Sequence, residues 1–415
     1  MENIVRVSGR LFSSAAFVLS IASAAVAAPD EDLLGKAQGY PVGSPKTWLY
    51  DEKVRVGSFS AVHRVVKQHT LTKPPTASPL PRAATEPVIR YRFENQDATI
   101  DDFLARQRVM SLLVIKDGQI LVERYQYDRI AEHRFISHSM AKSITALAVG
   151  YALAEGRIKS LDDTVETYAK KLAGTAYGRA RIRDILRMAS GVPFTEVYDG
   201  KDDNFRYSLL RSQKGLIGAL RAFGDRTAVA PGTRFHYASI ETQVLGALVQ
   251  AVTGETLSRY LTTRLWQPLG AEADAAWNIV DVDKFESASG GFNAVLRDYG
   301  RLGMLLANDG MRDGRQIIPR DFLLEATDWR RHPEAFQPRK ATPYFGYGYQ
   351  FWIYPGDKRR FALLGVYGQS MFVDPGTKLV MVVTAANKTA SADGTTLARE
   401  RDALWRGLVT MYGGW

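Results

Sequence analysis

Ser139 and Lys142, a serine and a lysine three positions apart, are the residues best suited to chemistry in this sequence. They lie near the start of a helix expected from Ser137 to about Glu155, which carries no charged residue between Ser143 and Ala154. A helix that is apolar nearly all round is buried, and residues three apart share one face. Burial lowers the pKa of a lysine, so a neutral Lys142 can take the proton of the Ser139 hydroxyl. The helix N-terminus would stabilise an oxyanion at the acyl carbon bound to the serine.

The same pair also has a purely structural interpretation, in which Ser139 caps the helix and Lys142 extends its ammonium to the surface. Two further segments favour the chemical interpretation. Tyr237, in the turn segment Pro231–Ser239, precedes an amphipathic helix and could act beside the lysine as a base or proton shuttle, with a packed core tyrosine as the alternative. The segment Gly365–Gln369 follows a strand, where glycines allow a ligand to approach the backbone closely.

These three segments occur in the order typical of the serine β-lactamase-like superfamily, which the chain resembles from roughly Thr99 to its C-terminus. The superfamily includes class C β-lactamases, penicillin-binding DD-peptidases, family VIII esterases and 6-aminohexanoate-dimer hydrolases, and S-x-x-K is one of its catalytic motifs. The matching segments are Ser139-Met140-Ala141-Lys142, Tyr237-Ala238-Ser239 for Y-x-N or Y-x-S, and Val366-Tyr367-Gly368 for K-T-G or H-T-G. Supporting stretches that look similar include Leu186–Gly191, Gly290–Phe292 and Asp298–Gly303.

The resemblance implies an α+β fold of the β-lactamase/transpeptidase type, with an antiparallel sheet flanked by helices and a helical subdomain. It implies that Ser139 is the acylated nucleophile and Lys142 its activator, with Tyr237 as the base toward the serine and the acid toward the leaving group. The oxyanion hole would use the backbone N–H groups of Ser139 and Gln369, with the third motif aligned to within one residue. The other residues expected to contact the substrate are Gly368, Tyr367, Ser239 and Tyr198.

Two departures from the family pattern bear on the substrate. Val366 stands where the first residue of K-T-G normally meets a substrate carboxylate, and Ser239 stands where β-lactamases usually carry asparagine. Both favour a small-molecule ester or linear amide as substrate over a penicillin. The stretch Ser139–Ser143, with Tyr198 after Ser190-Gly191, looks most like the 6-aminohexanoate-dimer hydrolase group.

Two alternatives remain open at this stage. A β-lactamase or DD-peptidase is the alternative enzyme. A non-catalytic penicillin-binding-like module that binds peptidoglycan is the alternative of another class, although such a module has no need of a buried lysine beside a serine.

The elements that must position these residues come from both ends of the chain. After a helix expected at Ile100–Arg108 and capped by Thr99, two strands flank a turn at Asp117-Gly118. The expected strands are Ser111–Ile115, Gln119–Tyr125, Phe361–Val366, Ser370–Val373 and Leu379–Thr384, followed by a closing helix at Ala398–Val409. Strands at both ends with helices between them predict one antiparallel sheet built from distant segments, with a helical insertion at about 160–280.

Residues 1–27 have the pattern of a secretory signal peptide, in which arginines precede an apolar run and Ala25-Val26-Ala27 matches a cleavage site. A retained membrane anchor is the alternative, but serines interrupt the run and it is short for a membrane span. We therefore expect a periplasmic or secreted protein without a membrane anchor after cleavage. Residues 28–98, proline-rich at 73–81, are expected to wrap the main domain, residues 99–415.

Composition removes several other classes of function. The 415 residues are 46% hydrophobic and 24% charged, as in a soluble globular protein. The chain has no cysteine, which excludes disulfides, thiolate metal sites and cysteine nucleophiles. Its net charge of +10 is spread without a basic block, so no nucleic-acid partner is expected. The six histidines show no i,i+4 pair and no H-E-x-x-H motif, so no metal is expected, and acyl transfer through serine needs no cofactor.

Overall fold

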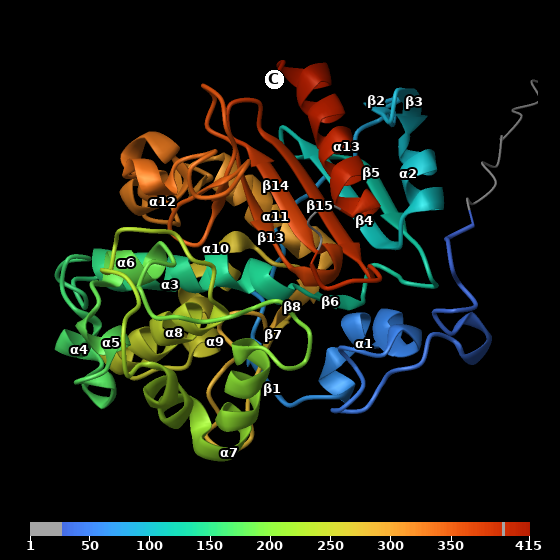
Figure 1. Cartoon of the computed structure of the whole chain (residues 1–415). Coiled ribbons are helices and arrows are strands. Elements are labelled where there is room, and N and C mark those ends of the chain that lie inside the picture. The colour runs from blue at the N-terminus through green and yellow to red at the C-terminus, as the bar shows by residue number, and fades with distance from the viewer. Residues whose placement is uncertain (1–26, 392–394) are drawn as a thin grey trace, which may run out of the picture.

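The computed structural model describes residues 27–391 and 395–415 (Figure 1). Apart from Ala27, the expected leader lies outside the described residues. The central element is a seven-stranded sheet in which every neighbouring pair is antiparallel. Its strands, in spatial order, are β11 (Gly346–Tyr347), β12 (Trp352–Ile353), β13 (Phe361–Leu364), β14 (Ser370–Asp374), β15 (Leu379–Ala385), β4 (Val109–Lys116) and β5 (Gln119–Tyr125). The prediction of an α+β fold with one antiparallel sheet made from distant segments is confirmed.

The join between the two ends of the chain is the pairing of β15 with β4, which runs from Leu379 opposite Lys116 to Ala385 opposite Val109. The β4–β5 hairpin closes through Asp117 and Gly118, at φ of 51° and 78°. Positive φ at both central residues is what a tight hairpin turn requires, and the Asp-Gly pair allows it.

Strand β13 is two residues shorter than expected and ends at Leu364. The chain leaves the sheet at Gly365 and enters a 3-10 turn, Val366–Gly368, in which Tyr367 has a φ of 60°. A residue in the left-handed region cannot continue a strand. The expected strand end at Val366 was therefore wrong, because Val366 already belongs to the turn.

The two faces of the sheet carry alternate side chains, and each face is covered by a long helix (Figure 1). Leu112 and Val114 of β4 pack in one core cluster with helix α13 (Thr396–Tyr412). Leu113 and Ile115 point the other way and pack in the cluster that contains helix α11 (Leu296–Ala307). The period-two alternation of a strand thus assigns apolar residues to both faces, and the sheet is buried on both.

Helix α11 contains the stretch Asp298–Gly303 and lies very close to the sheet at its two glycines. A Cβ at Gly300 would lie 2.5 Å from Leu113, and one at Gly303 would lie 2.5 Å from Val380. Side chains at these positions would push the helix away from the sheet. The glycines of this stretch therefore serve packing.

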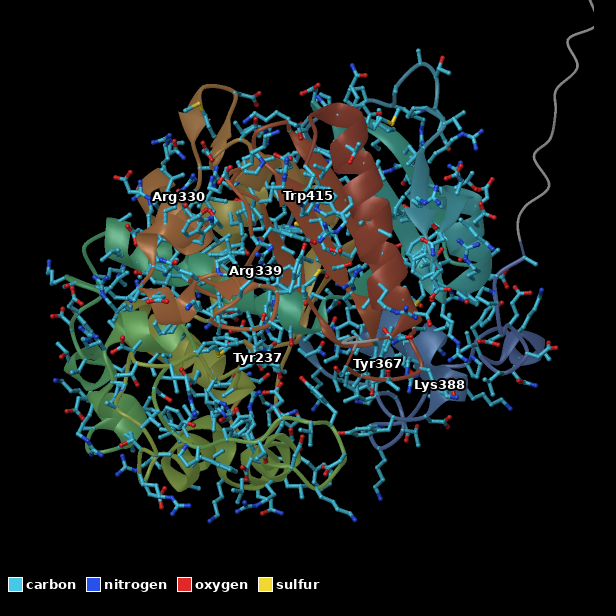
Figure 2. The ribbon with its side chains drawn as sticks, turned by 45° about the horizontal axis from the view of Figure 1, so that its top comes forward. Tyr237, Arg330, Arg339, Tyr367, Lys388 and Trp415 are labelled. Carbon is cyan, nitrogen blue, oxygen red and sulfur yellow. The ribbon has the colours of Figure 1, made fainter. Side chains whose placement is uncertain are left out.

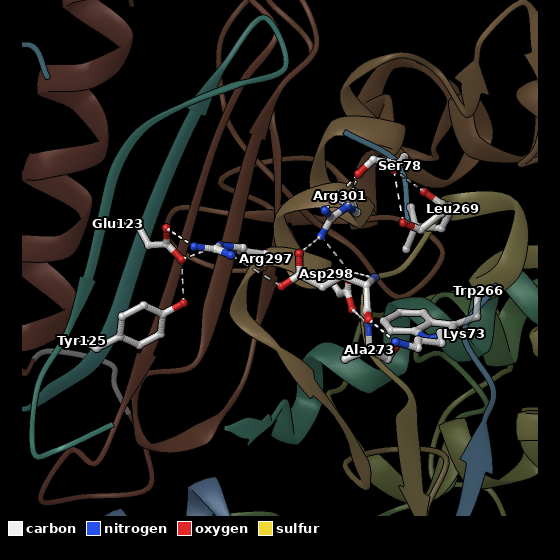
Figure 3. A network of polar contacts seen from close by, with 12 residues as sticks. Lys73, Ser78, Glu123, Tyr125, Trp266, Leu269, Ala273, Arg297, Asp298 and Arg301 are labelled. Carbon is white, nitrogen blue, oxygen red and sulfur yellow. Dashed lines mark hydrogen bonds and ion pairs between the residues drawn. The ribbon is translucent and has the colours of Figure 1, made fainter. Parts of the chain in front are cut away.

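A network of polar contacts fixes α11 to its surroundings (Figure 3). Asp298 accepts the backbone N–H groups of Glu272 and Ala273 at 2.9 and 3.0 Å, and Arg301 donates to Asp298 at 2.9 Å. Arg301 also donates to the carbonyl of Ser78 at 3.0 Å, which attaches the N-terminal segment to the helix. Burial raises the pKa of Asp298 to about 6.

The region between the two ends of the chain is mainly helical and lies below the sheet in Figure 1. A four-stranded antiparallel sheet joins this region to the rest, in the order β1 (Gln68–Leu71), β7 (Ala275–Asn278), β8 (Phe292–Val295) and β6 (Arg134–Ile136). Its helices are α3 (Ala141–Ala154), α4 (Val165–Tyr168), α5 (Ala176–Arg179), α6 (Ile182–Leu186), α7 (Asp203–Phe223), α8 (Ser239–Thr253), α9 (Leu257–Leu261) and α10 (Gln267–Leu269). The remaining helices are α1 (Arg55–Ser60), α2 (Ile100–Arg106) and α12 (Arg320–Thr327), and the remaining strands form the hairpins β2 (Arg90–Phe93) with β3 (Gln96–Thr99) and β9 (Met311–Arg312) with β10 (Arg315–Gln316).

Residues 28–98 contribute secondary structure to both halves of the molecule. Strand β1 is an edge strand of the four-stranded sheet, and the β2–β3 hairpin lies beside α13. The expected capping of α2 by Thr99 is present as a reciprocal capping box with Asp102. None of the helices in the described ranges is long and apolar enough to cross a membrane.

Candidate active site

The first predicted motif lies at the start of α3, where a 3-10 turn, His138–Met140, leads into the helix. The helix is buried from Ala141 to Ala152, as its apolar sequence predicts. His138 has a φ of 44°, which is an uncommon conformation for a residue with a side chain and occurs mostly where the surrounding structure imposes it. Ser139 is 8% exposed and Lys142 is 2% exposed. The lysine is therefore beneath the surface and does not extend to solvent.

Lys142 donates hydrogen bonds to two oxygen atoms. Its Nζ lies 2.8 Å from Ser139 Oγ and 2.9 Å from the carbonyl oxygen of Ser289. Burial lowers the pKa of Lys142 to about 8, and the more distant carboxylate of Glu196 opposes that effect. A substantial fraction of the lysine is thus neutral near pH 8, with its lone pair beside the serine hydroxyl.

Tyr237 completes the predicted trio at the end of the segment that leads into α8. Lys142 Nζ lies 5.1 Å from the centre of the Tyr237 ring. The ring stacks on Trp352 of β12 at 5.5 Å and meets Tyr347 of β11 edge-on at 6.3 Å. The structure therefore brings Ser139, Lys142 and Tyr237 together from the starts of α3 and α8, and aromatic residues at the sheet edge pack against the tyrosine.

Ser239 and Tyr198 converge on a carboxylate that the sequence analysis missed, Glu196. The Ser239 hydroxyl and backbone N–H each donate to this carboxylate at 2.6 Å, and the Tyr198 hydroxyl donates at 2.5 Å. Tyr198 has a φ of 61°, so the short loop carrying both residues is held in an uncommon conformation. Glu196 belongs to no motif, and only its position two residues before Tyr198 could have drawn attention to it.

The third predicted segment reaches the site through Gly365, Val366 and Tyr367, of which Tyr367 was among the expected substrate contacts. Gly365 passes directly beside the nucleophile, because a Cβ there would lie 3.1 Å from Ser139 N and 2.5 Å from the carbonyl oxygen of Ser137. Val366 and Tyr367 line the same cavity as Ser139. Val366 begins its 3-10 turn, so its backbone N–H has no acceptor within that turn.

Gly368 and Gln369 do not line this cavity. Gln369 is fully buried, and its side-chain amide exchanges hydrogen bonds with the backbone of Ala385 at 2.7 and 3.0 Å. A Cβ at Gly368 would lie 2.5 Å from Leu397 of α13. Gln369 packs against β15 and Gly368 packs against α13. These positions do not support contact with a substrate.

The cavity has a volume of about 260 Å³ and lies between the helical region and the end of β13. Figure 2 shows Tyr237 and Tyr367 on the two sides of this central region. Its lining residues are Trp48, Leu49, His138, Ser139, Tyr198, Asn204, Tyr207, Ser208, Arg211, Ser239, Gln243, Val280, Ser287, Ser289, Gly290, Val366 and Tyr367. A larger cleft of about 820 Å³ lies beside α11 and the β9–β10 hairpin, but none of the predicted site residues lines it.

The N-terminal segment forms one wall of this cavity, which the sequence did not indicate. Trp48 stacks on the His138 ring at 6.3 Å, and Phe59 meets the same ring edge-on at 4.6 Å. The Arg55 guanidinium lies 4.4 Å from the centre of the Tyr367 ring and donates to the carbonyl of Asn387 at 2.7 Å. Burial and the positive charge of Arg55 lower the pKa of His138 to about 3, so this histidine is a neutral packing residue.

A second buried acid lies behind the site, on α8. Glu241 is 1% exposed and accepts the Ser190 hydroxyl at 2.7 Å and the Ser190 backbone N–H at 3.3 Å. It thereby joins α8, which follows Tyr237, to the turn at Ser190-Gly191. Burial raises the pKa of Glu241 to about 8, with a smaller contribution from Asp184.

Comparisons with known proteins agree with this architecture. The family model described as Beta-lactamase matches residues 97–404. A 6-aminohexanoate-dimer hydrolase of Paenarthrobacter ureafaciens is 26% identical over 319 residues, which cover 73% of this chain and 79% of the relative.

Two solved structures have the same fold at lower identity. A putative 6-aminohexanoate-dimer hydrolase from Bacillus anthracis has a TM-score of 0.77 at 24% identity, covering 89% of this chain and 96% of that one. A family VIII carboxylesterase has a TM-score of 0.56 at 17% identity, covering 73% of this chain and 93% of that one.

The fold is that of the serine β-lactamases and penicillin-binding proteins, with a serine and a buried lysine at the junction of its two parts. The chain belongs to the β-lactamase family. The family resemblance that the three motifs predicted is thus confirmed, and the relatives of this chain include a hydrolase of that family.

Glu241 gives a testable dependence of stability on pH. Its pKa is about 8 in the folded protein against 4.5 for an ordinary glutamate, so the unfolded chain loses this proton first as the pH rises. The contribution of Glu241 to the free energy of unfolding should fall between pH about 4.5 and about 8 and stay constant above that range. We expect Glu241→Gln to remove this fall, as measured by urea unfolding across the range. The surface variant Glu94→Gln should keep it, and a slope equal to wild type in Glu241→Gln would contradict the assignment.

Proposed function

We propose that this protein hydrolyses esters or linear amides through an acyl-serine intermediate on Ser139. The observation that carries the proposal is the 2.8 Å contact between Lys142 Nζ and Ser139 Oγ, in a site where burial lowers the pKa of the lysine to about 8. A lysine that only packed or supplied charge would not need to be placed beneath a serine hydroxyl at hydrogen-bond distance. Ser139 also opens onto the cavity, so an acyl group can reach it.

The acylation step follows from the positions of the three side chains. Ser139 Oγ attacks the acyl carbon as its proton passes to neutral Lys142, which lies within hydrogen-bond reach. Tyr237, beside the lysine, donates its phenolic proton to the leaving alcohol or amine as the carbon–oxygen or carbon–nitrogen bond breaks, and it takes up the proton that Lys142 received from Ser139. Water then attacks the acyl-serine and passes one proton to neutral Lys142. As the bond between the acyl carbon and Ser139 Oγ breaks, that proton returns to Oγ and the acid is released.

The oxyanion of each tetrahedral intermediate needs two donors on one side of the acyl carbon. We propose the backbone N–H groups of Ser139 and Val366 for this role. Gly365 supports this choice, because its lack of a side chain allows the strand end to approach Ser139 N closely. This replaces Gln369, whose position is buried against Ala385.

The substrate class is inferred from what the third segment lacks. With Gly365 as the glycine of K-T-G, the lysine position falls on Leu363, which is 1% exposed, and in the earlier alignment it falls on Val366. Either alignment places an apolar residue where family members bind a substrate carboxylate with a cation. The names of the relatives, a 6-aminohexanoate-dimer hydrolase and a carboxylesterase, support an ester or linear amide. The leader-like N-terminus supports a periplasmic or secreted location.

The first test is covalent labelling of the nucleophile. A fluorophosphonate probe should form an adduct that mass spectrometry maps to Ser139. Lys142→Arg should abolish labelling and hydrolysis, because arginine stays protonated in proteins and cannot accept the serine proton. Ser212→Ala, at an exposed serine on α7, should label like wild type. An adduct on another serine, or near-normal turnover of Lys142→Arg, would overturn the proposed step.

A second test uses the pH at which the lysine loses its proton. With a pKa of about 8 for Lys142, kcat/KM should rise with pH and level off above about 8. The Glu196 carboxylate raises that pKa, so Glu196→Gln should move the rise to lower pH. The pH at which kcat/KM rises in Glu196→Gln is informative even if the loss of contacts to Ser239 lowers the maximum rate. The exposed variant Glu94→Gln should leave the profile in place, and a shift of Glu196→Gln to higher pH would contradict the assignment.

A third test compares substrates on one preparation: p-nitrophenyl butyrate, a linear 6-aminohexanoate dimer and nitrocefin. A charge-assisted hydrogen bond to a carboxylate contributes about 1.5 to 3 kcal/mol, so its absence should lower kcat/KM for the β-lactam by roughly 10- to 150-fold relative to an enzyme that has it. Val366→Lys should raise nitrocefin turnover with a smaller effect on the butyrate. If nitrocefin is the best of the three substrates for the wild type, the substrate class is wrong although the nucleophile can stand.

A further inference from the structure

One face of helix α7 points its polar side chains into the cavity that contains Ser139. Asn204, Tyr207, Ser208 and Arg211 all line this cavity. They are spaced i, i+3, i+4 and i+7, which places them on a single stripe of the helix. Ser208 is exposed and Asn204 is half-buried, whereas Tyr207 and Arg211 are only 4% and 5% exposed. The helix thus presents hydrogen-bonding groups to the space beside the nucleophile.

Arg211 is the permanently charged side chain of this lining. Its guanidinium donates to Ser287 Oγ at 3.1 Å and to the carbonyl oxygens of Phe285 and Glu286 at 3.0 and 2.9 Å. All these acceptors are neutral, and no carboxylate in the described part of the chain forms an ion pair with Arg211. Its Nε is buried without a hydrogen-bond partner. A buried cation with neutral neighbours and a free donor is costly unless an anion completes its environment.

The Tyr207 hydroxyl, one turn before Arg211, is also buried without a hydrogen-bond partner. Burial raises the pKa of this phenol to about 12, although the nearby Arg211 guanidinium opposes the rise. The two groups do not satisfy each other with good hydrogen-bond geometry. Two adjacent residues that line the cavity on one face of α7 therefore each carry a buried donor without an acceptor.

We propose that Arg211 and Tyr207 form a subsite for the free carboxylate of a linear substrate, such as a dicarboxylic acid half-ester or an oligomer of an ω-amino acid. The proposal rests on the hydrolase function proposed above and adds the chemical class of the chain. The unpartnered Nε supplies one charge-assisted N–H to the carboxylate, while Nη1 and Nη2 stay on the 285–287 loop. Tyr207 donates a further hydrogen bond, and Asn204 and Ser208 extend the polar surface along the helix.

This anchor differs in place from the cation of K-T-G enzymes. Arg211 comes from α7 in the helical region, whereas Val366 lies at the end of β13 on the wall formed by the sheet (Figure 1). In K-T-G enzymes the carboxylate of a β-lactam lies close to the scissile bond, so it is bound by a cation on the wall formed by the sheet. A flexible chain can instead place its reacting carbonyl at Ser139 and its carboxylate at α7.

The test compares matched anionic and neutral substrates on the same variant. The pairs are p-nitrophenyl hydrogen adipate with p-nitrophenyl hexanoate, and the acetyl ester of 6-hydroxyhexanoate with the methyl ester of that compound. The first pair places the carboxylate on the acyl chain and the second on the leaving group, so the preferred pair identifies the side. For that pair, Arg211→Gln should lower the ratio of kcat/KM, anionic over neutral, by about 10- to 150-fold. Tyr207→Phe should lower it by roughly 2- to 10-fold.

The ratio separates binding of the carboxylate from support of the 285–287 loop. If Arg211 serves only that loop, Arg211→Gln will lower the rates for both members of a pair equally, and the unchanged ratio would overturn the proposal. Arg206→Gln, at an exposed arginine of α7 paired with Asp203, should leave the ratio at the wild-type value.

A binding measurement keeps this inference distinct from the hydrolase function. Hexanoate should raise the melting temperature of the wild-type protein and raise that of Arg211→Gln much less. If the protein binds hexanoate in this way but hydrolyses no ester or amide, the proposed function fails while the subsite stands. If hexanoate stabilises wild type and Arg211→Gln equally, the subsite assignment is wrong whatever the enzyme hydrolyses.

Discussion

The burial of Lys142 beneath Ser139 is the constraint on which the rest of the site depends. An ammonium at the start of a helix that is apolar on all sides loses its hydration, and no carboxylate hydrogen-bonds to it in the described chain. Burial lowers the pKa to about 8, and the charge of Glu196, whose carboxylate is hydrogen-bonded by Ser239 and Tyr198, opposes that effect. A direct salt bridge would keep the lysine charged and remove its use as a base.

The cavity at that site has walls from separate parts of the chain. The 3-10 turn before α3 supplies Ser139, the start of α8 supplies Ser239, the turn after β13 supplies Val366, and the N-terminal segment supplies Trp48 and Leu49. Three residues around the cavity, His138, Tyr198 and Tyr367, have φ of 44°, 61° and 60°. Such conformations persist only where the surrounding packing imposes them, and they cluster at functional sites. Here each one occurs where a wall of the cavity turns.

The sequence by itself determined the core of the site and the class of fold. The uncharged run after Lys142 indicated a buried helix, and this in turn indicated a lysine with a lowered pKa. The strand segments expected at both ends of the chain and the Asp117-Gly118 turn predicted the sheet, because strand-forming composition and turn chemistry are local properties of the chain. The order of the three motifs was enough to identify the family.

Only the tertiary structure decided which residues surround those motifs. Ser289 contacts Lys142, Glu196 accepts from Ser239, and Arg211 lines the cavity, yet all three come from loops and a helix with no motif, so no spacing in the sequence could place them at the site. The third motif also had to be located in space: Gly365 passes beside Ser139 N just after β13 ends at Leu364, whereas the Gln369 side chain packs against Ala385. Contacts between residues far apart in the sequence, such as Trp48 on His138, depend on how the elements pack, and local sequence patterns do not encode that packing.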